Sequence, residues 1–185
     1  MSSSSPIVTV FGSSTVTRDQ RPYRLAYDLG RELARAGATV MTGGYSGVME
    51  ACSRGAHDAG GHIIGVTVEL FEKRSPVNAW VKERVHTADL FERLRTMLVR
   101  ADAFVTVPGS LGTLTELFLT WTLLSVEARP AAPLILLGDP WDPMLEALRH
   151  PELVTPGLFD HVRTTPDPVV AARLALAGVP ERERA

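Results

Sequence analysis

The chain alternates short apolar runs with segments of helical periodicity, and this alternation constrains the fold more than any other feature. The apolar runs are of strand length, and most of them stop at or next to a glycine or a Pro-Gly pair. Between them, leucines recur at four-residue spacing, as at Leu25, Leu29 and Leu33, and so line one face of a helix. Strands are predicted at 7–11, 38–41, 62–68, 85–87, 103–107 and 133–137. Helices are predicted at 23–36, 47–59, 89–100, 113–126, 144–148 and 166–176, and a loop at 69–83.

This order of elements predicts the fold class. Apolar strands that alternate with helices are typical of a parallel sheet covered on both faces. Short connections and right-handed crossovers then give a Rossmann-like, doubly wound α/β fold. The length of 185 residues suits one domain over 1–185. We expect 1–5 to be disordered and 180–185 to form a polar tail.

Composition argues against several classes of protein. The formal net charge of −2 disfavours a broadly basic surface for nucleic acid. No apolar run is long enough to span a membrane and no secretory signal is visible, so a cytoplasmic protein is expected. One cysteine and the spacing of the histidines predict no metal site. The lysines, Lys73 and Lys82, lie in a polar connection, which argues against pyridoxal-phosphate chemistry.

Glycine-rich loops follow three of the predicted strands, at 12–14, 42–47 and 108–113. Ligands of doubly wound sheets bind outside the carboxyl ends of the strands, so the three loops are expected to face one crevice. Backbone N–H groups at a glycine turn that feeds a helix can cradle a phosphate. The residues predicted to bind it are Ser13, Gly43, Gly44, Gly47, Gly109, Ser110, Gly112 and Thr113. The alternative is that these glycines only form tight turns. Neither a dinucleotide fingerprint nor a Walker A loop is present.

Two charged residues are candidates for chemistry beside that phosphate. Glu116 comes three residues after Thr113 and can bond ribose hydroxyls or position water, or it can simply favour the dipole of a first helical turn. Arg93 can bind a phosphate, a carboxylate or a nucleobase, or it can be a solvated arginine on an amphipathic helix. The face of that helix predicted to be buried consists of Leu90, Leu94, Met97 and Leu98.

The motifs at 10–14, 42–50, 60–66 and 108–116, with Arg93 ahead of the last, resemble the Lonely Guy (LOG) family. The hallmark of that family is a P-G-G-x-G-T-x-x-E run preceded by an arginine helix. The resemblance implies a homodimeric hydrolase that takes a small-molecule nucleotide, needs no cofactor, and cleaves nucleoside 5′-monophosphates to a free base and ribose 5-phosphate. It also places Arg93 and Glu116 at the catalytic positions and the glycine loops around the 5′-phosphate.

The chain departs from the family pattern at two positions. Leu94 stands where a lysine is usual, and Ser110 stands where the hallmark has its second glycine. These departures favour an alternative, a non-catalytic protein of the same superfamily that binds or carries a nucleotide or the molybdenum cofactor. A single-strand DNA binder is a third hypothesis, which the absence of a basic stripe from the sequence disfavours.

Overall fold

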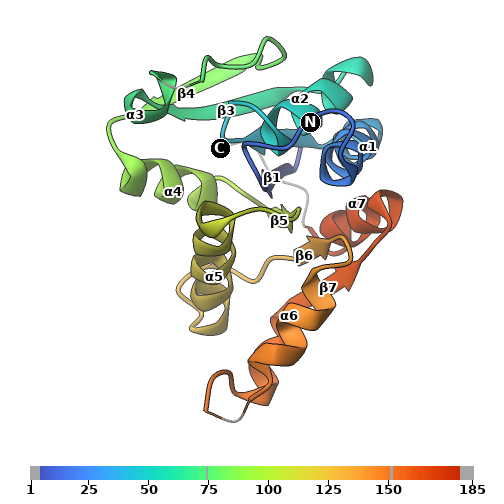
Figure 1. The fold of residues 1–185 in the computed structure, drawn as a ribbon, viewed down its shortest axis with the longest axis vertical. Coiled ribbons are helices and arrows are strands. Elements are labelled where there is room, and N and C mark those ends of the chain that lie inside the picture. Colours follow the sequence, from blue (N-terminus) through green and yellow to red (C-terminus); the bar gives the residue numbers. More distant parts are fainter. Residues whose placement is uncertain (1–4, 74, 151, 180–185) are drawn as a thin grey trace, which may run out of the picture.

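The computed structural model describes residues 5–73, 75–150 and 152–179 (Figure 1). The predictions for 1–4 and for the 180–185 tail lie outside these residues. The strands are β1 Ile7–Phe11, β2 Thr39–Thr42, β3 Ile63–Val68, β4 Glu83–Thr87, β5 Ala103–Thr106, β6 Leu134–Leu137 and β7 Val162–Thr165. The helices are α1 Arg21–Arg35, α2 Val48–Asp58, α3 Glu69–Glu72, α4 Leu90–Val99, α5 Leu111–Ser125, α6 Trp141–Leu148, the 3₁₀ helix η1 Pro156–His161, and α7 Pro168–Leu176.

All seven strands pair in parallel in one sheet, in the order β4-β3-β2-β1-β5-β6-β7. The chain therefore builds outward from β1 in one direction and then returns to build outward from β5 in the other. This confirms the Rossmann-like, doubly wound fold. The order reverses between β1 and β5, and such a switch point is where ligands of open α/β sheets bind.

Helices cover both faces of the sheet, which is why the central strands are apolar on both sides. One core joins side chains of α1, α2 and α7 to the sheet, and the other joins side chains of α4, α5 and α6 to the opposite face (Figure 1). Strands β2, β3, β5 and β6 are buried along their whole length. Across the described residues, no helix combines the length and the apolar character needed to cross a membrane.

The predicted elements are found with boundaries that differ by a few residues, and three elements were not predicted: α3, η1 and β7. Helix α3 lies inside the segment predicted as a loop, because a single turn is too short to show a period. Strand β7 is an edge strand with the pattern half-buried, exposed, half-buried, buried, so it contains no continuous apolar run. Helix α4 begins as predicted: the Asp89 carboxylate caps it by accepting a bond from the Glu92 N–H at 2.8 Å.

Candidate active site

A cavity of about 560 Å³ opens at the carboxyl end of β1, next to the switch point of the sheet. All three glycine-rich loops contribute to its wall, as the parallel arrangement predicts. It is lined by Val10, Phe11, Gly12, Ser14, Thr15, Gly43, Tyr45, Ser46, Met49, Phe71, Ser75, Leu90, Arg93, Leu94, Met97, Ser110, Gly112, Thr113, Thr115 and Glu116. Among these lining residues, Arg93 and Glu116 carry the charges; the others offer hydroxyl groups, backbone or apolar surface.

Ser13 connects the three loops behind the cavity wall. Its carbonyl accepts a bond from the Val48 N–H at 2.8 Å, and its own N–H donates to the Pro108 carbonyl at 3.4 Å. A Cβ on Gly47 would lie 2.3 Å from the Ser13 oxygen, and a Cβ on Gly109 would lie 2.7 Å from the Ser13 nitrogen. Both glycines are therefore needed for close packing between loops, and neither lines the cavity directly.

The first turn of α5 supplies the part of the wall best suited to an anion. Ser110 is the N-cap and makes no side-chain cap bond, while Gly112 and the buried Thr113 follow it in the first turn. The opening N–H groups of a helix have no partner within the helix, and the helix dipole adds partial positive charge at the same place. Ser110, Gly112 and Thr113 all line the cavity, so this helix end faces a space that a phosphate could occupy.

The Arg93 side chain crosses from α4 into the cavity wall and is only 7% exposed. Its Nε donates to the Val66 carbonyl at 2.9 Å, which ties the guanidinium to β3. The guanidinium carbon lies 5.9 Å from the centre of the Tyr45 ring and 5.5 Å from that of Phe71. Hydrogen bonding and ring contacts on several sides fix one orientation of the group.

Glu116 faces Arg93 across the cavity wall, with 3.7 Å between Glu116 Oε1 and Arg93 Nη1. Burial raises the pKa of Glu116 from its ordinary value of 4.5 to about 7, although the positive charge of Arg93 acts in the opposite direction. Burial likewise lowers the pKa of Arg93, and Glu116 partly offsets this change. A carboxyl group whose pKa lies near neutrality can exchange a proton at physiological pH, as general acid–base catalysis requires.

The structure corrects the predicted burial of α4. Arg93 lies on the buried side with Met97 and Leu98, whereas Leu90 is 38% exposed and Leu94 is half-buried. The reason is that Leu90 and Leu94 line the open cavity instead of packing into the core. The hypothesis of a solvated arginine is therefore wrong.

The hypothesis that Glu116 only favours the dipole of a first helical turn is also wrong. Helix α5 begins at Leu111, which places Glu116 in the second turn, and the first turn holds no acidic residue. The Glu116 side chain is 15% exposed, so it is not a solvated group that merely complements the helix dipole.

Sequence reasoning missed the aromatic part of the site. Tyr45 is anchored by its hydroxyl, which accepts from the Val68 N–H and donates to the Val68 carbonyl, both at 2.8 Å. Phe71 stands edge-on to Tyr45, with 5.9 Å between ring centres. Tyr45 lies within the second glycine loop, so the sequence alone could have identified it as a residue of the site. Phe71 reaches the cavity through α3, which the sequence does not predict.

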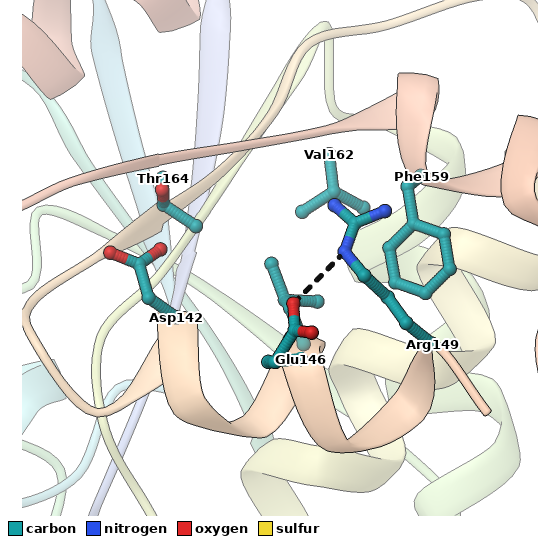
Figure 2. Close-up of a pocket in the computed structure, with 7 residues that line it drawn as sticks. Asp142, Glu146, Arg149, Phe159, Val162 and Thr164 are labelled. Carbon is teal, nitrogen blue, oxygen red and sulfur yellow. Dashed lines mark ion pairs between the residues drawn. The ribbon is translucent and has the colours of Figure 1, made fainter.

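A smaller hollow of about 240 Å³ lies between α6, η1 and β7 (Figure 2). Arg149 forms an ion pair with Glu146 there, at 3.4 Å, and its guanidinium lies 4.3 Å from the centre of the Phe159 ring. The Glu146 side chain is 78% exposed, so the pair is solvated. No predicted site residue lines this hollow. Among residues 5–73, 75–150 and 152–179, no group of three acidic, histidine or cysteine side chains is arranged to hold a metal ion.

Known proteins resemble this chain in sequence and in structure. The cytokinin riboside 5′-monophosphate phosphoribohydrolase LOG3 of Arabidopsis thaliana is 33% identical over 134 residues, which cover 71% of this chain and 62% of that protein. This chain thus spans only 58% to 62% of the length of such curated relatives.

Two solved structures share the fold over 94% of this chain. The molybdenum cofactor binding protein of Rippkaea orientalis has a TM-score of 0.73, 27% identity, and 96% of its chain covered. The molybdenum cofactor carrier protein of Chlamydomonas reinhardtii has a TM-score of 0.67, 26% identity, and 99% of its chain covered. Residues 5–127, more than half of the chain, match the sequence model of the SLOG cluster4 family. The chain therefore belongs to the SLOG cluster4 family, in agreement with its predicted Lonely Guy resemblance.

Proposed function

We propose that this protein hydrolyses the N-glycosidic bond of a nucleoside 5′-monophosphate, a cytokinin riboside monophosphate or AMP, to a free base and ribose 5-phosphate. One observation carries the proposal: the buried pair of Arg93 and Glu116 lines the same cavity as the three glycine-rich loops. Homologous phosphoribohydrolases at 32% to 37% identity support the reaction class.

The phosphate is proposed to bind at the first turn of α5. The N–H groups of Gly112 and Thr113 and the hydroxyls of Ser110 and Thr113 supply donors there without a lysine or a metal ion. Behind this turn, the backbone hydrogen bonds of Ser13 to Val48 and Pro108 link the three glycine-rich loops. Binding of the phosphate then holds the ribose in place. The binding energy of the phosphate thus aids cleavage of the N-glycosidic bond, although the phosphate lies away from that bond.

Glu116 and Arg93 act on the sugar and the base. As the bond between C1′ and the base nitrogen breaks, positive charge develops on the ribose, and a carboxylate beside it stabilises that charge. Water adds to C1′ and loses a proton to the Glu116 carboxylate, and Glu116 then passes a proton to the departing base nitrogen. The sum is therefore substrate plus water to base plus ribose 5-phosphate, with Glu116 unchanged. Arg93 holds the substrate and favours departure of the base.

A second candidate is a carrier that binds a nucleotide or the molybdenum cofactor without cleaving it. Two observations favour it: Leu94 lines the cavity where the family usually has a lysine, and Ser110 adds a side chain at the phosphate turn. The two cofactor-binding proteins that share this fold give it further support. A carrier requires only the donor set of α5 and the apolar surface of the cavity.

Incubating the pure protein with AMP and with isopentenyladenosine monophosphate separates the two candidates. Hydrolysis predicts free base and ribose 5-phosphate in equal amounts, and Glu116→Gln removes turnover while the nucleotide still binds. Binding without any cleavage by the wild-type protein, at substrate concentrations that saturate the site, would favour the carrier. Exposed Glu152→Gln is the matched control, since Glu152 lies far along the chain and outside the cavity lining.

We further propose that a second copy of the chain covers α4 and α5, to give a homodimer. Helix α5 is apolar on most of its circumference, yet its first residue Leu111 is 78% exposed and its C-cap Val126 is 64% exposed. Phe91 on α4 is 84% exposed. Helices that are apolar all round are normally buried. Sedimentation of the wild-type protein and of Phe91→Glu tests this: the variant shifts toward monomer, whereas Val169→Glu on α7 does not. A wild-type monomer at micromolar concentration would contradict it.

A further inference from the structure

Gly43 touches the guanidinium of Arg93, and this contact leaves no room for a side chain. A Cβ built on Gly43 would lie 1.8 Å from Arg93 Nη2 and 2.6 Å from Met49 Sδ. Separations below 3.0 Å are not found for real Cβ atoms. The space that Gly43 leaves free is therefore the space that the arginine head group occupies.

Backbone conformation does not explain why this position is glycine. Gly44 and Gly47, in the same loop, have φ values of +79° and +68°, which favour glycine. Gly43 is not among the positive-φ glycines of the described residues, so an alanine can adopt its backbone conformation. The requirement at Gly43 is spatial, and it comes from side chains of other elements: Arg93 of α4, which is the nearer, and Met49 of α2.

The arginine is held on its other sides and has little freedom to yield. Its Nε is bonded to the Val66 carbonyl, and the rings of Tyr45 and Phe71 lie against the guanidinium. A methyl group at position 43 must push Nη2 from 1.8 Å to at least 3.0 Å. A shift of that size alters the 3.7 Å approach of Nη1 to Glu116.

We infer that Gly43 is a positioning residue, whose missing side chain seats the Arg93 guanidinium against Glu116. In this assignment Gly43 acts through Arg93, and the phosphate donors come from the first turn of α5. The kinetic consequence rests on the proposed hydrolysis, whereas the effect on the Arg93–Glu116 pair does not.

The first test is Gly43→Ala, with Gly157→Ala as the matched control because a Cβ at Gly157 meets no atom within 4 Å. Carboxyl ¹³C NMR, with the Glu116 signal assigned from its loss in Glu116→Gln, follows the titration of that group. Displacing Arg93 weakens its attraction for the carboxylate, so the pKa of Glu116 rises above about 7 in Gly43→Ala and stays in place in Gly157→Ala. An unchanged Glu116 titration in Gly43→Ala overturns the inference, whether or not the protein turns over nucleotides.

Turnover gives a second readout if the wild-type protein hydrolyses nucleotides. A misplacement of about 1 Å can lower the rate by about 100-fold. Gly43→Ala is therefore expected to lower kcat by roughly 10- to 100-fold and to change KM less, because the phosphate site is untouched. A rise in KM at constant kcat would instead assign Gly43 to substrate binding and overturn the positioning role.

A double-variant cycle covers the case in which Gly43→Ala folds poorly. Truncating Arg93 to alanine removes the nearer of the two side chains that a Cβ at position 43 would meet. Gly43→Ala is therefore expected to lower the unfolding midpoint clearly less in the Arg93→Ala background than in the wild-type background. Equal losses of midpoint in both backgrounds would show that the alanine clashes with something other than Arg93, Met49 included, and would refute the assignment.

Discussion

Glu116 is predicted to make the stability of this protein fall as pH rises, and Glu116→Gln to remove that fall. Its pKa is about 7 in the folded protein against an ordinary 4.5, so the folded state binds this proton more tightly than the unfolded chain does. The stabilising contribution is therefore complete below about pH 4.5 and is lost as the pH rises through 7. Since each pKa unit corresponds to about 1.4 kcal/mol, the difference amounts to about 3 kcal/mol.

Urea unfolding from pH 4.5 to 8, followed by fluorescence of the buried Trp121 and Trp141, measures this contribution. Glutamine is not ionised, so the free energy of unfolding of Glu116→Gln relative to wild type increases by about 3 kcal/mol across that range. Arg93 stays charged throughout this pH range. The stability that Glu116→Gln loses by leaving Arg93 beside a neutral glutamine is therefore the same at each pH, and it does not affect how the difference in free energy of unfolding changes with pH. Parallel curves for the two proteins would refute the buried, near-neutral Glu116 described here.

Three further substitutions test other parts of the structure. Leu94→Lys adds a cation to the cavity lining, so the affinity for AMP, measured by calorimetry, is expected to rise about tenfold at low salt and by less at high salt. An unchanged affinity would show that the phosphate binds outside this cavity. Ser110→Gly loses no side-chain cap bond, so the free energy of unfolding measured by chemical denaturation is expected to change by less than about 0.5 kcal/mol. A larger loss of stability would show that the Ser110 side chain makes a stabilising contact. Asp89→Ala removes the cap of α4 and should cost about 1 kcal/mol in the same measurement; no loss would refute the cap.

The sequence predicts those parts of the fold whose signal is local. Strands β3 and β6 are buried throughout, so β6 appears in the sequence as an uninterrupted apolar run and β3 as a run that is apolar except at Thr67. Strand β7 pairs only with β6 and leaves Arg163 exposed, so its pattern resembles that of a loop. The sequence pattern therefore detects the central strands and misses the edge strand β7, whereas the other edge strand, β4, was predicted only in part, at 85–87.

In the candidate site, too, the sequence predicts the features that depend on local patterns and misses those that depend on contacts between elements. The position of the glycine loops follows from parallel strand order alone, because the carboxyl ends of parallel strands meet at one edge. The burial of Arg93 does not follow from the periodicity of α4, since it depends on the Val66 carbonyl and on rings supplied by other elements. Phe71 was missed for the same reason: its place in the cavity is set by the sheet and by a one-turn helix.

The central claim is that one cavity brings a phosphate-binding helix end together with the Arg93–Glu116 pair. A crystal structure of Glu116→Gln with bound AMP tests it most directly. The account predicts the 5′-phosphate within hydrogen-bond distance of the N–H groups of Gly112 and Thr113, with C1′ beside Gln at position 116 and the Arg93 guanidinium. A phosphate bound away from the first turn of α5, or a ribose remote from position 116, would contradict it.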